Sequence, residues 1–188
     1  MFAQSPASGP VVDDLLRATV AEYPDRPALG PLDRAVDFRT FDARVNRIAN
    51  GLLAEGAPGD RIAIVGRNSE EQVELMFAIA RAGQVVLPIN WRLSPREIAY
   101  ILAHSGAARV FADREFADAV ESAREGRDIS VLFLDDGGPD GFAAWRDRQS
   151  EAAVLCPATA GDVVLQMYTS GTTGLPKGVL LTNANVMD

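Results

Sequence analysis

Residues 168–178, with the sequence Tyr-Thr-Ser-Gly-Thr-Thr-Gly-Leu-Pro-Lys-Gly, constrain this chain more than any other stretch. These eleven residues hold four Ser or Thr hydroxyls, three glycines and one lysine. Glycine lets the backbone adopt positive φ and approach a ligand, while hydroxyls, N–H groups and an ammonium donate hydrogen bonds to phosphate oxygens. The composition therefore predicts a loop that binds an anion. The residues expected to bind it are Thr169, Ser170, Gly171, Thr172, Thr173, Gly174 and Lys177.

The surroundings of the loop favour a polyphosphate ligand. Apolar runs at residues 163–167 and 179–181 predict that the loop joins two strands. Lys177 is the only charged residue between positions 163 and 187, in a chain whose formal net charge is −8. No carboxylate close in sequence neutralises this ammonium, so the loop should be locally cationic.

The loop differs from the common nucleotide-binding motif, in which Gly-Lys is followed by Ser or Thr and then by a helix. Here Pro176 precedes the lysine and Gly178 follows it. The alternative is a long glycine-rich hairpin turn whose hydroxyls only cap their own backbone. Such a turn requires no lysine among the hydroxyls, so phosphate binding is the favoured interpretation.

The run from Tyr168 to Val179 resembles the AMP-binding signature of the adenylate-forming enzymes, a superfamily of acyl-CoA synthetases, luciferases and peptide-synthetase adenylation domains. Segments 23–29, 59–64 and 88–102 are similar to the acyl-CoA synthetase branch, so the resemblance extends from about residue 11 to the end. Asn183 departs from the pattern, because many members of the family carry histidine there.

This resemblance implies a two-step reaction. A carboxylate attacks the α-phosphate of ATP to give acyl-AMP and pyrophosphate, and a thiol, expected to be CoA, then displaces AMP. The hydroxyls of the loop would hold the β- and γ-phosphates, Lys177 would offset their charge, and Mg²⁺ would accompany ATP. In the family, the adenine and ribose motifs, the acyl pocket and a lysine of a C-terminal lid domain all follow this signature. No catalytic residue beyond the loop is therefore assigned.

The resemblance thus predicts the N-terminal portion of a ligase that activates a carboxylic acid, which is expected to be a fatty acid. This portion should be inactive on its own. Residues 1–10 should form a flexible arm, and residues 11–188 an incomplete AMP-binding domain. One alternative is an amino-acid or aryl-acid adenylation domain. Others are a naturally short phosphate-binding or interaction module, and a degenerate fragment without a ligand.

Composition excludes several other functions. The balance of 18 basic and 26 acidic residues, without a basic cluster, argues against a nucleic-acid partner. No apolar run approaches the roughly 20 residues needed to span a bilayer, so we expect a cytoplasmic protein without a transmembrane segment. Cys156 is the only cysteine, which excludes an internal disulfide and a thiol-based metal site. We expect no metal site built from protein side chains.

The pattern of apolar runs and caps predicts an α/β fold. Strands are expected at residues 62–65, 85–89, 109–112 and 129–134, and helices after Ser69, after Ser94 and over residues 114–124. Capping boxes are predicted at residues 69–72 and 94–97. Because strands and helices alternate, the sheet should be mostly parallel with helices on both faces, ending in the Ser/Thr/Gly-rich phosphate loop between two strands.

Several residues are expected to be structural or solvent-exposed and to take no part in binding or catalysis. Thr40 should cap a helix, and Glu70, Glu71 and Glu74 should form a solvent-exposed face. The apolar face of that helix is expected at Val73, Met76, Phe77 and Ala80. Residues 143–161 should form a surface connection, and His104 should be an ordinary residue in the last turn of a helix.

Overall fold

A six-stranded sheet forms the centre of the protein in this computed structural model, which describes residues 9–169 and 175–188. The predicted arm at residues 1–10 lies almost wholly outside this range. The strands, in sheet order, are β6 (Ser130–Phe133), β5 (Ala107–Ala112), β3 (Arg61–Val65), β4 (Val85–Pro88), β7 (Val163–Thr169) and β8 (Lys177–Thr182). A small antiparallel sheet contains β1 (Pro27–Leu29) and β2 (Val36–Asp37).

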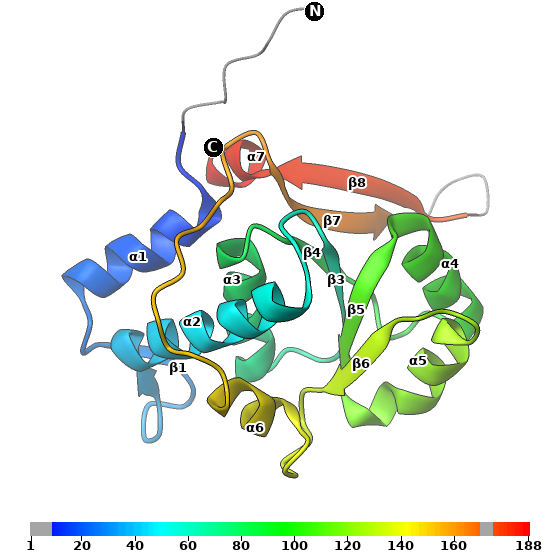
Figure 1. The fold of residues 1–188 in the computed structure, drawn as a ribbon, viewed down its shortest axis with the longest axis horizontal. Coiled ribbons are helices and arrows are strands. Elements are labelled where there is room, and N and C mark those ends of the chain that lie inside the picture. The colour runs from blue at the N-terminus through cyan, green and yellow to red at the C-terminus, as the bar shows by residue number, and fades with distance from the viewer. Residues whose placement is uncertain (1–8, 170–174) are drawn as a thin grey trace, which may run out of the picture.

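Helices cover both faces of the central sheet (Figure 1). They are α1 (Val12–Glu22), α2 (Phe38–Glu55), α3 (Glu70–Arg81), α4 (Pro95–Ser105), the 3-10 turn Arg114–Phe116, α5 (Ala117–Arg124), α6 (Phe142–Asp147) and α7 (Asn183–Met187). One apolar cluster joins the sheet to α1, α2, α3 and α6, and a second joins it to α4 and α5. None of the helices in the described part of the chain is long and apolar enough to span a bilayer.

The sheet is mostly parallel, as predicted. The neighbours β6–β5, β5–β3, β3–β4 and β4–β7 are parallel, and only β7–β8 is antiparallel. The β3–α3–β4 connection crosses one face and the β4–α4–β5 connection crosses the other, as in a doubly wound domain. The predicted fold class and the two strands that flank the loop are therefore confirmed.

Local capping chemistry fixes most helix starts. Ser94 and Glu97 form the predicted capping box of α4, with Pro95 at its first position. Ser69 Oγ accepts a hydrogen bond from the Gln72 amide at 3.2 Å, but the Gln72 side chain does not complete the predicted box.

Helix α2 begins earlier than predicted. Thr40 is not its N-cap, because the Asp37 carboxylate accepts the Thr40 amide at 2.7 Å and the helix starts at Phe38. A carboxylate is at least as good an N-cap acceptor as a threonine hydroxyl.

The prediction for the surface of α3 is partly wrong. Glu74 is 1% exposed, and its two oxygens accept hydrogen bonds from Arg44 at 2.8 Å and Arg146 at 2.9 Å. The helix buries Leu75, Ala78 and Ile79 against α2 and the sheet, whereas Met76 is 37% exposed. The buried face is therefore rotated relative to the predicted one. The Glu74 carboxylate lies within it because Arg44 of α2 and Arg146 of α6 neutralise its charge.

A second buried ionic group joins three helices. Arg81 of α3 has no exposed surface and donates to Asp13 of α1 at 2.7 Å and to Asp42 of α2 at 2.7 Å. Asn46 accepts from the same guanidinium at 2.9 Å, and Arg17 donates to the second oxygen of Asp13 at 2.6 Å. This group is called the Arg81 cluster below.

Residues 143–161 are not only a surface connection. Helix α6 begins at Phe142, one residue before this segment, and buries Trp145 within it. The rings of Phe142 and Trp145 contact each other and Phe111 of β5. The polar, alanine-rich composition of the segment hid this anchor, because only two large apolar residues carry it.

Candidate functional site

The two ends of the predicted loop lie at the carboxyl edge of the parallel sheet. Strand β7 runs parallel to β4 and ends at Thr169, and β8 starts at Lys177, so residues 170–176 connect the two strands at that edge. In doubly wound sheets, ligands bind outside the carboxyl ends of the strands. The topology therefore places Thr169 and Lys177 at the edge where a ligand site is expected.

The structure brings two of the predicted site residues together. Thr169 and Lys177 are directly paired across β7 and β8, and both are exposed. Ser170, Gly171, Thr172, Thr173 and Gly174 lie outside the described residues. We call the pairs Thr169–Lys177 and Tyr168–Gly178 the loop root.

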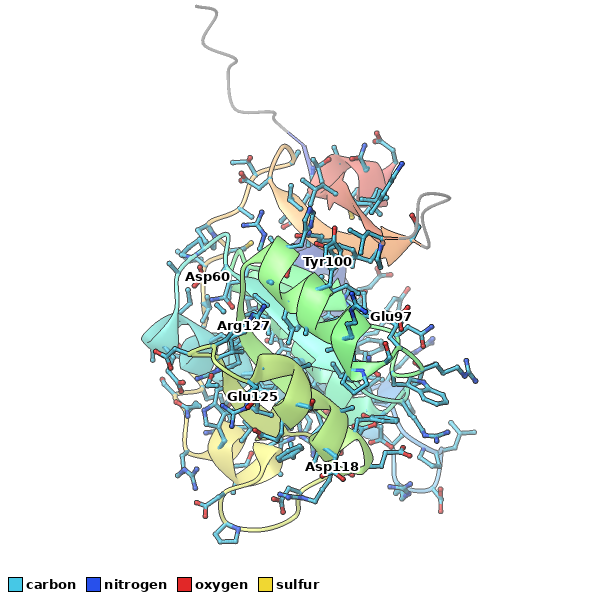
Figure 2. All side chains as sticks on the ribbon, turned by 90° about the vertical axis from the view of Figure 1, so that its right-hand side faces the viewer. Asp60, Glu97, Tyr100, Asp118, Glu125 and Arg127 are labelled. Atoms are coloured by element: carbon cyan, nitrogen blue, oxygen red, sulfur yellow. The ribbon has the colours of Figure 1, made fainter. Side chains whose placement is uncertain are left out.

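A line of polar side chains lies behind the loop root, on the face of β7 that α4 covers. Arg61 Nε donates to Gln166 Oε1 at 3.3 Å, Gln166 Nε2 donates to the Tyr168 hydroxyl at 3.1 Å, and that hydroxyl is 2.7 Å from His104 Nδ1. Burial raises the pKa of Tyr168, so its hydroxyl stays protonated at neutral pH. Tyr100 stacks on the His104 ring, and Figure 2 shows it on the side of α4 next to β7 and β8.

Sequence reasoning missed this polar chain. The sequence pattern predicts His104 to be an ordinary helix-end residue, but its ring contacts Tyr168, which directly precedes Thr169. The two partners are 64 positions apart, so no local pattern could have paired them.

Asn183 has a structural position in this chain. It is 2% exposed, accepts a hydrogen bond from the Val12 amide at 3.0 Å, and donates to Thr159 O at 3.1 Å and Asp162 O at 3.3 Å. The amide therefore joins the start of α1 to the end of β8, a task that needs one acceptor and two donors.

The Cys156 thiol is not suited to catalysis. Burial raises the pKa of the Cys156 thiol, which contacts Ala80 O at 3.4 Å, so it is a poor nucleophile. Among residues 9–169 and 175–188, no three His, Cys, Asp or Glu side chains are grouped as metal ligands.

Fold and topology define a doubly wound α/β domain with a candidate ligand site at its carboxyl edge. The family model described as AMP-binding enzyme matches residues 16–188, so the chain belongs to this family. The predicted family resemblance is confirmed.

Similar proteins include two bacterial ligases. A fatty acid–acyl-carrier-protein ligase of Streptomyces coeruleorubidus is 38% identical over 85% of this chain and 30% of its own length. A long-chain-fatty-acid–CoA ligase of Mycobacterium tuberculosis is 36% identical over 90% of this chain and 34% of its own. The chain thus spans about a third of these curated relatives.

A solved structure agrees with this family. The anthranilate CoA ligase AuaEII, in complex with anthranoyl-AMP, superposes with a TM-score of 0.84 at 26% identity, covering 93% of this chain and 35% of that one.

Proposed function

We propose that this chain, from about residue 11, is the N-terminal portion of an ATP-dependent, AMP-forming ligase that activates a fatty acid as acyl-AMP and transfers it to CoA. The observation that carries the proposal is the family match over residues 16–188, which includes the loop and both flanking strands. The two relatives described above are both named for fatty acids but differ in the named acceptor. A fatty acid as the substrate is therefore better supported than CoA as the acceptor. A carrier protein is the alternative acceptor.

The proposed task of the loop is electrostatic. Thr169 and Lys177 are paired at the carboxyl edge, where the hydroxyl and the ammonium would contact the β- and γ-phosphates of ATP. We propose the same role for residues 170–174, which lie outside the described residues. Lys177 would neutralise charge on pyrophosphate as it departs, because a cation placed where charge develops lowers the barrier. Mg²⁺ would arrive with ATP, since it prefers phosphate oxygens and water to an all-protein cage.

Titration calorimetry with magnesium pyrophosphate and with MgATP tests the loop. The wild-type chain should bind both, and Lys177→Ala should weaken binding about 10-fold or more, as expected for a charge-assisted contact. Arg127→Ala is a matched control that removes the same unit of charge from an exposed residue (Figure 2). Arg127 precedes β6 and so lies at the amino edge of the sheet, away from the loop. Equal binding by the wild type and Lys177→Ala would refute the assigned role.

We propose that the isolated 188 residues do not catalyse the reaction, because they span only about a third of the length of the ligases that they match. Incubation with MgATP and fatty acids of several chain lengths should give no acyl-AMP detectable by mass spectrometry. Formation of acyl-AMP would contradict this proposal. The intact mass of the protein from its native host would show whether these residues belong to a longer ligase or to a short phosphate-binding module.

An aryl acid is the second candidate substrate class. The structure bound to anthranoyl-AMP has a TM-score of 0.84 to this chain, which supports an aromatic acyl group as an alternative. Competition between benzoic and fatty acids in a pyrophosphate-release assay of the protein from its native host would separate the two.

A further inference from the structure

The polar chain behind the loop root has a defined direction. Arg61 can only donate, so its contact places Gln166 Oε1 toward the guanidinium and Gln166 Nε2 toward Tyr168. The Tyr168 oxygen accepts from that amide, which leaves the hydroxyl proton free to be donated to His104 Nδ1. The contacts therefore run from β3 through β7 to α4, and Tyr168 donates to His104 in the tautomer whose Nδ1 carries no proton.

The loss of the Gln166 contacts within the polar chain should be costly. Gln166 is 5% exposed and Tyr168 is half-buried, whereas His104 is exposed. Water therefore replaces a lost partner of Gln166 less completely than a lost partner of His104. Polar groups in a setting of low dielectric interact more strongly than at a surface, and a satisfied network favours one side-chain arrangement. The network thus fixes the position of the Tyr168 hydroxyl.

The fixed hydroxyl lies close to both strands of the loop root. Tyr168 directly precedes Thr169, and its partner Gly178 directly follows Lys177. A Cβ atom at Gly178 would lie 3.2 Å from Gln166 Nε2 and 3.3 Å from Tyr168 Cζ. Only glycine fits here without displacing the amide or the ring, so β8 passes close over the polar chain.

We propose that Tyr168, held by His104 and Gln166, is a positioning residue that sets the separation and orientation of Thr169 and Lys177 for phosphate binding. This inference rests on the proposed function, because the purpose of the alignment is phosphate contact. Neither Tyr168 nor the two side chains that hold it need to touch the ligand. They act through β7 and β8, whose ends carry the two ligand-binding groups.

Three variants and one control test the proposal in the 188-residue chain. Tyr168→Phe removes the hydroxyl and keeps the ring, and His104→Leu removes its acceptor. His104→Gln restores an acceptor on a side chain of similar reach, so it should rescue the loss. Tyr100→Phe is the matched control, because it deletes a tyrosine hydroxyl from α4, the helix that carries His104, and keeps the ring that stacks on His104.

Two readouts are needed, one without ligand. Lys177 is the only lysine of the chain, so selective ¹⁵N-lysine labelling yields one backbone amide signal that reports on the loop root. Tyr168→Phe and His104→Leu should shift this signal and increase hydrogen exchange of residues 166–169 and 177–180 about fivefold, as expected for the loss of one hydrogen bond. The affinity for magnesium pyrophosphate should fall by a similar factor. Tyr100→Phe and His104→Gln should resemble the wild type in both readouts.

The outcomes separate this inference from the proposed function. An unchanged Lys177 signal and unchanged exchange in Tyr168→Phe would overturn the inference, even if pyrophosphate binds. The inference would also be overturned if these two readouts changed while the affinity for pyrophosphate stayed constant. Failure of the wild type to bind pyrophosphate or MgATP would refute the proposed function and, with it, the positioning role in phosphate binding. In that case the signal and exchange data would still show whether Tyr168 holds the loop root.

Discussion

Substitution at the Arg81 cluster should have a large effect on stability. The Arg81 and Asp13 side chains both have 0% exposure, and Arg81 Nε lies 2.7 Å from Asp13 Oδ1. Arg81→Met removes the buried cation and leaves the Asp13 carboxylate with Arg17 as its remaining partner. Breaking a buried pair by removing one partner costs about 3–5 kcal/mol, because the other charge stays buried and undercompensated.

The loss is large compared with the total stability of a domain, about 5–15 kcal/mol. For a chain of this length it corresponds to a decrease in Tm of roughly 6–20 °C. Urea unfolding monitored by circular dichroism gives the free energy of unfolding if the slope m is unchanged. Arg39→Met is the control, since Arg39 and Asp25 form a similarly short 2.8 Å pair with side chains 66% and 79% exposed. That variant should unfold like the wild type.

A double variant decides whether the effect comes from the pair. Asp13→Asn alone should also destabilise the fold, because it removes a buried partner of Arg81. Asp13→Asn combined with Arg81→Met should lose about 1–3 kcal/mol less than the sum of the single losses. Additive losses, or a loss from Arg81→Met no larger than that from Arg39→Met, would refute the reasoning.

Further predictions concern three other positions. Glu74→Ala leaves Arg44 and Arg146 without their shared buried carboxylate. The free energy of unfolding, measured by urea unfolding, should therefore fall by about 3–5 kcal/mol. Gly83 has φ +68°, and a Cβ there would lie 2.7 Å from Pro157 Cγ, so Gly83→Ala should lower stability by about 1–2 kcal/mol or more. Burial raises the pKa of Asp113, which favours its neutral form in the folded state. The contribution of Asp113 to stability should therefore increase as pH falls from neutral through that raised pKa. The free energy of unfolding of the wild type, measured in urea relative to Asp113→Asn, should rise over the same pH range.

Features with local causes could be predicted from the sequence. The apolar runs at β3, β4 and β5, and the capping box at Ser94 and Glu97, depend on residues close in sequence. Alternation of these elements was enough to predict a mostly parallel sheet with two covered faces. The loop was visible because its unusual composition lies within eleven consecutive residues.

Features that depend on distant partners could not be predicted. Glu74 can be buried because its carboxylate pairs with Arg44 and Arg146. These arginines lie 30 positions before it and 72 positions after it in the sequence. A glutamate in the first turns of a helix is usually solvated, and nothing local indicates two arginines from other helices. The Tyr168–His104 contact is hidden for the same reason, since it depends on how α4 packs on β7.

The place of β8 at the end of the sheet order has a consequence for solubility. Within the described residues it has a neighbour on one side only, and Val179 and Leu180 are 40% and 50% exposed. An exposed apolar edge strand can pair with another copy of the chain, and a lysine on the edge is a common protection against this. Lys177, the first residue of β8, is the only charge between positions 163 and 187. In the isolated 188-residue chain, the ammonium proposed to bind phosphate therefore also protects this edge. Lys177→Ala of that chain should self-associate at concentrations where Lys177→Arg stays monomeric in light scattering.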